Sequence, residues 1–319
     1  MSAMTSLVEP APYPAAYPQA AVRHRRHMPS WLKLFLVGAA LWAATVLITF
    51  ATLNVNLVPT VILLGSFLVP VTFVAFAFAR ADGVLTPQRI FTAFVVGGVL
   101  GVLGASVLES ALLRQPSGLG FVGVGLIEEA VKLGALWLLS RHLTRYTVRD
   151  GMVLGASVGF GFAALESAGY AFTSLFTPSG LSLLNVVETE ALRGALAPVG
   201  HGLWTAILGG VLFATAARAR NGRPRPRGSV FGWFLVVSAL HAMWDAAGIV
   251  AVWLTLLLTG TASQLRMIEL GQAPGVTQTQ VHLYTILNWS LLAADAAVGV
   301  VLLWLRWRRQ ATARVAHAR

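Results

Sequence analysis

Eight long apolar runs constrain the fold of this chain more than any other feature. About 20 residues at 1.5 Å each cross a ~30 Å hydrocarbon core, so each run is long enough to span a bilayer. Because lipid offers no water to unpaired backbone groups, such runs are helices. We expect an all-α, polytopic integral membrane bundle of about eight transmembrane helices. The runs lie near Trp31–Leu53, Leu57–Phe78, Ile90–Leu112, Leu119–Ser140, Gly151–Phe172, Gly194–Ala216, Ser229–Leu257 and Leu283–Trp307.

The composition agrees with a membrane location. Hydrophobic residues make up 56% of the 319 residues and charged residues 11%, against roughly 25% charged in soluble domains. The net charge of +11 suits a membrane surface better than a nucleic acid, because the basic residues are spread over loops and tails. The chain has no cysteine, which excludes disulfides, thiolate metal sites and a cysteine nucleophile.

The distribution of lysine and arginine predicts the topology. Of the 23 basic residues, Arg114, Arg193 and Arg266 fall on one side and Lys132 within the membrane, which leaves 19 on the other side. Under the positive-inside rule the side with 19 is cytoplasmic. Both termini are therefore expected in the cytoplasm.

Ionisable residues lie in the middle of four consecutive runs. An ionised carboxylate at bilayer depth costs a few kcal/mol even on the lower of the contested estimates, so such residues usually face a bundle interior and carry function. If the four helices pack together, these side chains can meet. The residues are Glu128, Glu129 and Lys132 in the fourth run, Glu166 in the fifth, His201 in the sixth and His241 in the seventh.

The local spacing of these residues indicates pairing. Glu128 and Glu129 lie four and three residues before Lys132, so either glutamate can pair with the lysine on one helix face. One lysine cannot neutralise two carboxylates, and the other must keep a proton, share one, or hold a cation. Asp245 lies one turn after His241 and can orient its imidazole. Two histidines with carboxylates are a plausible zinc ligand set.

Other polar and small residues have simpler interpretations. The segment Gly155-Ala156-Ser157-Val158-Gly159 matches GxSxG, but a nucleophile elbow requires a strand–turn–helix context. The glycine pairs Gly97/Gly101 and Gly155/Gly159 have the GxxxG spacing that is typical of closely packed membrane helices. Glu109 is expected at a solvated helix edge, and Asp295 is the least constrained of the membrane carboxylates.

Four motifs follow one another on the fourth to seventh runs, and together they resemble the PrsW family of bacterial intramembrane proteases, distantly related to the CAAX-prenyl proteases. The resemblance covers about Gly118 to Gly248. The motifs are Glu128-Glu129-Ala130-Val131-Lys132 (EExxK), Phe162-Ala163-Ala164-Leu165-Glu166 (FxxxE), Ala197-Pro198-Val199-Gly200-His201-Gly202-Leu203-Trp204-Thr205-Ala206, and His241-Ala242-Met243-Trp244-Asp245.

The resemblance implies that the protein hydrolyses a peptide bond in membrane-anchored protein substrates. In a metal version of the mechanism, Glu166, His201 and His241 hold zinc and Glu129 or Glu128 is the general base. In a metal-free version, the glutamate pair activates water directly with help from a histidine. Lys132 sets the charge state of the pair in both. The expected catalytic set is Glu128, Glu129, Lys132, Glu166, His201, His241 and Asp245.

The remaining expectations concern the organisation of the chain and its setting. Residues 1–30 form a disordered basic cytoplasmic tail, residues 31–307 an eight-helix transmembrane domain with its catalytic core at about 118–248, and residues 308–319 a second basic tail. The expected location is multi-pass in a bacterial inner or plasma membrane, with lipid and a membrane-anchored substrate as partners.

The rival interpretation is a proton- or cation-coupled transporter that uses the same carboxylates and histidines as a relay.

Overall fold

The computed structural model describes residues 28–81, 83–113, 120–216, 219, 222–225 and 227–317, with side chains to residue 308. Most of the predicted N-terminal tail and Arg114 lie outside these residues. The predicted all-α architecture is confirmed, since the one sheet in this part of the chain is a short β1–β2 hairpin. The elements are α1 (Ser30–Thr52), η1 (Val55–Leu57), α2 (Val58–Phe78), α3 (Pro87–Leu112), α4 (Gly120–Ser140), α5 (Val148–Ser174), β1 (Phe176–Thr177), β2 (Gly180–Leu181), α6 (Leu183–Leu196), η2 (Ala197–Val199), α7 (His201–Ala214), α8 (Gly228–Thr259), α9 (Ala262–Glu269) and α10 (Gln278–His317).

Seven helical segments of the described chain are long and apolar enough to cross a membrane. The remaining predicted span, Leu119–Ser140, corresponds to α4, whose 21 residues match the thickness of a hydrocarbon core. Its three charged residues, Glu128, Glu129 and Lys132, lie within five residues of one another in the middle of the helix. The polytopic helical membrane bundle is therefore confirmed. A membrane crossing by α4 stays a prediction, and it requires that these charges face the interior of the bundle.

The run predicted as a single helix at Gly194–Ala216 is broken in the structure. α6 ends at Leu196, and α7 begins only at His201. Pro198 has no N–H to donate to a helix, and Gly200 has the non-helical angles φ −99° and ψ −129°. The break places His201 at the first turn of α7, and α6 with α7 together cover the length of one span, Leu183–Ala214.

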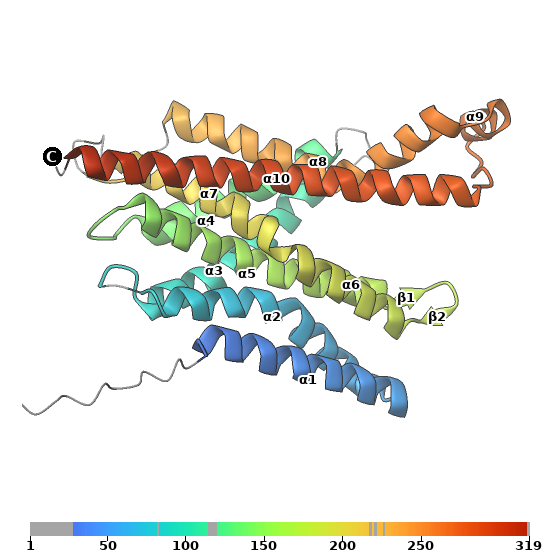
Figure 1. The fold of residues 1–319 in the computed structure, drawn as a ribbon, viewed down its shortest axis with the longest axis horizontal. Coiled ribbons are helices and arrows are strands. Elements are labelled where there is room, and N and C mark those ends of the chain that lie inside the picture. The colour runs from blue at the N-terminus through green and yellow to red at the C-terminus, as the bar shows by residue number, and fades with distance from the viewer. Residues whose placement is uncertain are drawn as a thin grey trace, which may run out of the picture.

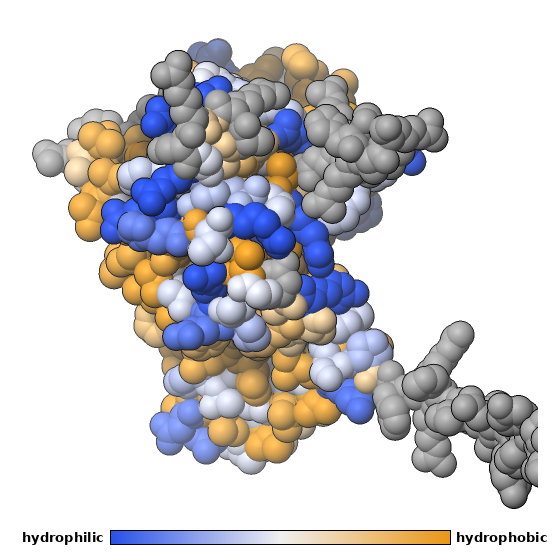
Figure 2. Space-filling view, turned by 90° about the vertical axis from the view of Figure 1, so that its left-hand side faces the viewer, coloured by the Kyte–Doolittle hydropathy of each residue, from blue (hydrophilic) through white to orange (hydrophobic). Residues whose placement is uncertain are grey.

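The bundle has one end at which the described chain both begins and finishes. The long helices run side by side, with the start of α1 and the C-terminal part of α10 at the same end (Figure 1). Hydrophilic side chains gather on that end between hydrophobic flanks (Figure 2). The exposed Arg141 and Arg145 precede α5 there, and Arg225 and Arg227 precede α8. This arrangement agrees with the predicted concentration of basic residues on one membrane side.

Glycines let α5 approach α7 until their backbones touch. A Cβ added at Gly151, Gly155 or Gly159 of α5 would overlap a carbonyl oxygen of α7, at Gly209, Thr205 and His201 respectively. The GxxxG interpretation is confirmed for Gly155 and Gly159. Because the carbonyl of His201 rests directly on Gly159, this contact fixes the height of the His201 side chain in the bundle.

Ser157, the central residue of the GxSxG match, lies in the middle of α5. Its side chain is fully buried, and its hydroxyl donates to the carbonyl of Val153 at 2.8 Å. A nucleophile elbow would instead expose the serine at a turn. The interpretation of this match as packing is confirmed.

The glycine contact predicts a specific loss of stability. Gly155→Ala forces α5 away from α7, and overpacking of this kind typically costs ~1–3 kcal/mol. The matched control is Gly169→Ala on the same helix, where an added Cβ meets nothing within 4 Å. Thermal unfolding of the purified protein in detergent should show a lower midpoint for Gly155→Ala and an unchanged one for Gly169→Ala. Equal midpoints would contradict the contact.

The topology is testable by cysteine labelling, because the chain has no cysteine of its own. Ser179 lies in the β-hairpin and Ser229 at the start of α8, and both are exposed. Ser179→Cys and Ser229→Cys should react with a membrane-impermeant maleimide from opposite sides of sealed vesicles. Labelling of both from one side would overturn the predicted number of crossings.

Candidate active site

The first part of the site is built by α4 against α8. Gly125 of α4 lies on the backbone of α8, where an added Cβ would come within 2.7 Å of the Ser238 carbonyl oxygen. This close approach brings the next turn of α4, with Glu128 and Glu129, against His241 of α8. All three side chains are buried, although each would prefer water as an isolated charge. They are therefore stable here only through one another.

Lys132 is the centre of the cluster. Its Nζ donates to Glu128 Oε2 at 3.1 Å and Glu129 Oε1 at 2.8 Å, and lies 2.7 Å from His201 Nδ1. The three ammonium protons thus have three acceptors. The ammonium also lies 4.0 Å from the centroid of the Phe162 ring, as a cation–π contact. Both predicted lysine–glutamate pairs are present.

The two histidines meet beside Lys132, with their ring centroids 4.9 Å apart. With Nδ1 accepting from Lys132, neutral His201 carries its proton on Nε2, which lies 2.9 Å from Glu166 Oε2. His241 Nδ1 lies 3.1 Å from Glu129 Oε1, and its Nε2 lies 3.5 Å from Asp245 Oδ2. Trp204 is fully buried and stacks on the His241 ring at 4.8 Å. Each imidazole is thus held in one orientation.

Arg193 is a member of the site that sequence reasoning did not identify. Its Nη2 pairs with Glu166 Oε2, its Nε donates to Ser167 Oγ at 2.8 Å, and its guanidinium lies over the Tyr170 ring. The same helix, α6, is anchored to α2 by a hydrogen bond from Ser66 to Glu190 at 2.7 Å. The excess of carboxylates over Lys132 indicated that further positive charge was needed, but sequence reasoning assigned Arg193 only to the non-cytoplasmic side of the membrane.

The cluster is closed on one side and open on the other. The side chains of Glu129 and Lys132 have no exposed surface, and that of Glu128 is 8% exposed. Exposure rises to 18% at Glu166 and 28% at Asp245. The cluster is therefore open on the side of Glu166, Arg193 and Asp245.

Three of these residues can hold a metal ion. One ligand atom from each of Glu128, His201 and His241 lies within 4.8 Å of the others. The expected carboxylate ligand, Glu166, pairs with Arg193 instead and contacts only one of the two histidines. Two imidazoles and a carboxylate are the ligands of many catalytic zinc sites, which keep a fourth position for water.

The charge balance of the cluster also fits a cation. Four carboxyl groups, those of Glu128, Glu129, Glu166 and Asp245, face two permanent cations, Lys132 and Arg193. The Lys132 ammonium is already held by two of the three candidate ligands, Glu128 and His201, so these groups converge on positive charge. In addition, the buried Glu129 Oε2 has no hydrogen-bond partner among the described residues. Donor set, charge and this free oxygen all suit a divalent ion with its water.

Two other membrane carboxylates lie outside this contact network. Asp295 of α10 is buried, and its Oδ2 has no partner within the described chain. Glu109 of α3 was expected at a solvated edge, but its Oε1 is buried and likewise without a partner among the residues described. Sequence reasoning therefore underestimated the burial of Glu109.

Comparison with known proteins identifies one family that the chain matches. No curated protein and no solved structure matches the chain. A family model described as PrsW family intramembrane metalloprotease matches residues 70–268. This range contains every residue of the cluster and extends beyond the 118–248 of the sequence resemblance on both sides. The chain therefore belongs to the PrsW family of intramembrane metalloproteases.

Proposed function

We propose that this protein hydrolyses a peptide bond in membrane-anchored protein substrates, with water activated at the Glu128–Glu129 pair. One observation carries the proposal: four carboxyl groups and two imidazoles from four helical segments form one connected network around Lys132 inside an apolar bundle. A cluster of this kind is costly at membrane depth, and ionisable residues placed there usually mark a functional site. Family membership supports hydrolysis over the rival transporter interpretation.

Glu128, His201 and His241 are the residues that we propose hold zinc. Zinc, when bound there, supplies a Lewis acid that polarises the scissile carbonyl and makes water a stronger acid. Glu166, which sequence reasoning placed among the ligands, then has another role. It accepts from His201 Nε2 and so keeps the opposite nitrogen, Nδ1, free of a proton and directed at the cluster centre.

Glu129 is the proposed general base, because its Oε2 is free among the described residues and it is outside the ligand group. It takes a proton from water as the water oxygen attacks the scissile carbonyl carbon. It then returns that proton to the amide nitrogen as the C–N bond breaks. The products are a carboxylic acid and an amine, and transfer of the acid proton to the amine gives a carboxylate and an ammonium group.

The surrounding residues keep these groups in place. Lys132 holds both glutamates at 2.8 and 3.1 Å, and Asp245 lies against His241 Nε2. Arg193 neutralises Glu166.

In the metal-free version of the mechanism, the base is Glu128, which is the more exposed member of the pair and lies 3.6 Å from His241 Nε2. The two versions differ in what Glu128 does, and that difference can be measured.

The proposed setting is the plasma membrane of a bacterial cell. The chain is a multi-pass membrane protein of an intramembrane protease family, so its substrates are embedded in or anchored to the same membrane. The concentration of basic residues at one end of the bundle supports a cytoplasmic location of that end.

Substitution of each glutamate by glutamine separates the two versions of the mechanism. Glu129→Gln should reduce cleavage of a single-span peptide by about 10²–10⁴-fold, the usual contribution of a general base, while zinc content stays unchanged. Glu128→Gln should lose cleavage and zinc together. Glu188→Gln, an exposed glutamate of α6, is the matched control. Metal analysis beside a cleavage assay provides both readouts, and an active wild type without metal would leave the metal-free version.

The Arg193–Glu166 pair has a consequence of its own. Arg193→Met leaves the Glu166 carboxylate without its cation and loosens the orientation of His201, so activity should fall by about 10–100-fold, as for other residues that orient ligands. Arg193→Lys should recover part of the loss. Arg141→Met, at the opposite end of the bundle, should behave as wild type. Full activity in Arg193→Met would show that Glu166 does not need this partner.

A further inference from the structure

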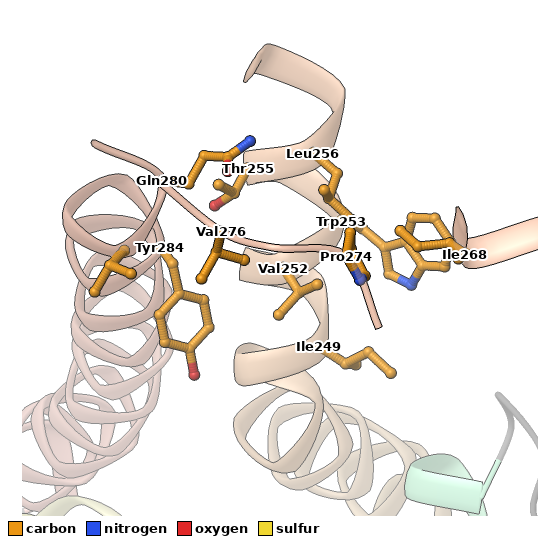
Figure 3. Close-up of a pocket in the computed structure, with 11 residues that line it drawn as sticks. Ile249, Val252, Trp253, Thr255, Leu256, Ile268, Pro274, Val276, Gln280 and Tyr284 are labelled. Carbon is orange, nitrogen blue, oxygen red and sulfur yellow. The ribbon is translucent and has the colours of Figure 1, made fainter. Parts of the chain in front are cut away.

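An apolar pocket of about 520 Å³ lies between α8 and α10, beside the segment that joins α9 to α10 (Figure 3). Ile249, Val252 and Leu256 of α8 line one wall, Tyr284 of α10 lines the opposite wall, and Val276 of the joining segment points between them. None of the described residues that line the pocket is charged. Its volume is within the range of small-ligand sites, ~300–1,000 Å³.

The pocket has a rigid wall, because two buried glutamines fasten the segment from α8 to α10. Gln264 and Gln280 exchange two side-chain hydrogen bonds of 3.0 Å. Gln264 also donates to the carbonyl of Gly275 at 2.7 Å, and Gln280 to that of Thr259. A capping box at Thr261 starts α9 within the same network. The segment is thus a folded cap, and the pocket keeps its shape without an occupant.

The pocket continues the open side of the candidate active site. Asp245, Ile249, Val252 and Leu256 are spaced by four, three and four residues, so they share one face of α8. At 1.5 Å per residue, the pocket residues lie about 6 to 16 Å beyond Asp245 along the helix. An extended peptide that rises ~3.3 Å per residue covers that distance in about two to five residues.

The polar atoms near the pocket favour a peptide over a lipid acyl chain. The Tyr284 hydroxyl lies 3.5 Å from the Cβ position of Gly248, at the level of α8 between Asp245 and Ile249. This hydroxyl makes no hydrogen bond with another described residue. An extended peptide brings carbonyl and N–H groups past it, whereas an acyl chain has none to offer.

We propose that this pocket binds apolar side chains of the membrane-anchored substrate, about two to five residues from the scissile bond, and so selects the substrate. The position of the scissile bond rests on the proposed function. The family match ends at residue 268, so the Tyr284 wall and the Val276 segment lie outside it. The catalytic cluster lies inside it.

Photo-crosslinking tests the pocket without requiring catalysis. A benzoylphenylalanine is introduced at Val252 or at Leu235, both on α8 and both 44% exposed, in the full-length Glu129→Gln protein in lipid nanodiscs. The probe is a synthetic leucine-rich single-span peptide with a labelled end. Crosslinking to the peptide should be several-fold stronger from Val252 than from Leu235. Equal yields, or adducts with lipid alone at Val252, would overturn the proposal.

Filling the pocket tests its role in substrate selection. Val252→Trp in the active protein should raise KM for a cleaved single-span peptide about tenfold with kcat nearly unchanged, since a misfit of a methylene or more in an apolar pocket changes discrimination by this order. Leu235→Trp is the matched control. An unchanged KM in Val252→Trp would contradict the proposed role of the pocket. Strong crosslinking from Val252, combined with a wild-type protein that cleaves no peptide, would contradict only the proposed function.

Discussion

The buried ammonium of Lys132 is the interaction on which the rest of the site depends. It has no exposed surface, and a lone charge in such a place would be strongly unfavourable. Two glutamates and His201 accept its three protons, so its location is set by groups from two different helices. Removing any one of them leaves a buried charge without its partner, which costs more than the interaction itself contributed. The helices therefore can hardly move apart without the cluster losing its charge balance.

His201 of α7 and His241 of α8 can join the cluster around Lys132 only because the helix backbones come unusually close. Gly125 lets α4 lie on α8, and Gly159 lets α5 lie on the carbonyl of His201. A Cβ at either position would overlap a carbonyl oxygen of the neighbouring helix, so the helices would have to move apart. Small residues at helix contacts and polar residues between helices are thus two parts of one arrangement, as in membrane helix association generally.

The sequence predicted most of the fold and most members of the buried cluster, because both depend on residue type and spacing. Long apolar runs predicted the helices, and i,i+3 and i,i+4 spacing predicted the Lys132 pairs. The break before His201 was missed, although Pro198 and Gly200 signal it, because a hydropathy pattern registers apolar character and not backbone angles. Arg193 was missed as a member of the cluster, and it pairs with Glu166, the carboxylate that was predicted as a metal ligand. Which side chain faces which across helices depends on rotation about each helix axis, and linear spacing does not determine it.

α8 joins the chemical centre to the apolar pocket, and this limits how either can change. His241 and Asp245 belong to the cluster, while Ile249, Val252 and Leu256 of the same helix line the pocket. A rotation of α8 that moved the histidine would move the pocket with it. α10 and the Gln264–Gln280 cap supply the other wall and have no part in the contacts around Lys132. Substitutions there can reshape the pocket without touching the contacts around Lys132, so the buried charged cluster and the apolar pocket are separate parts of one helix.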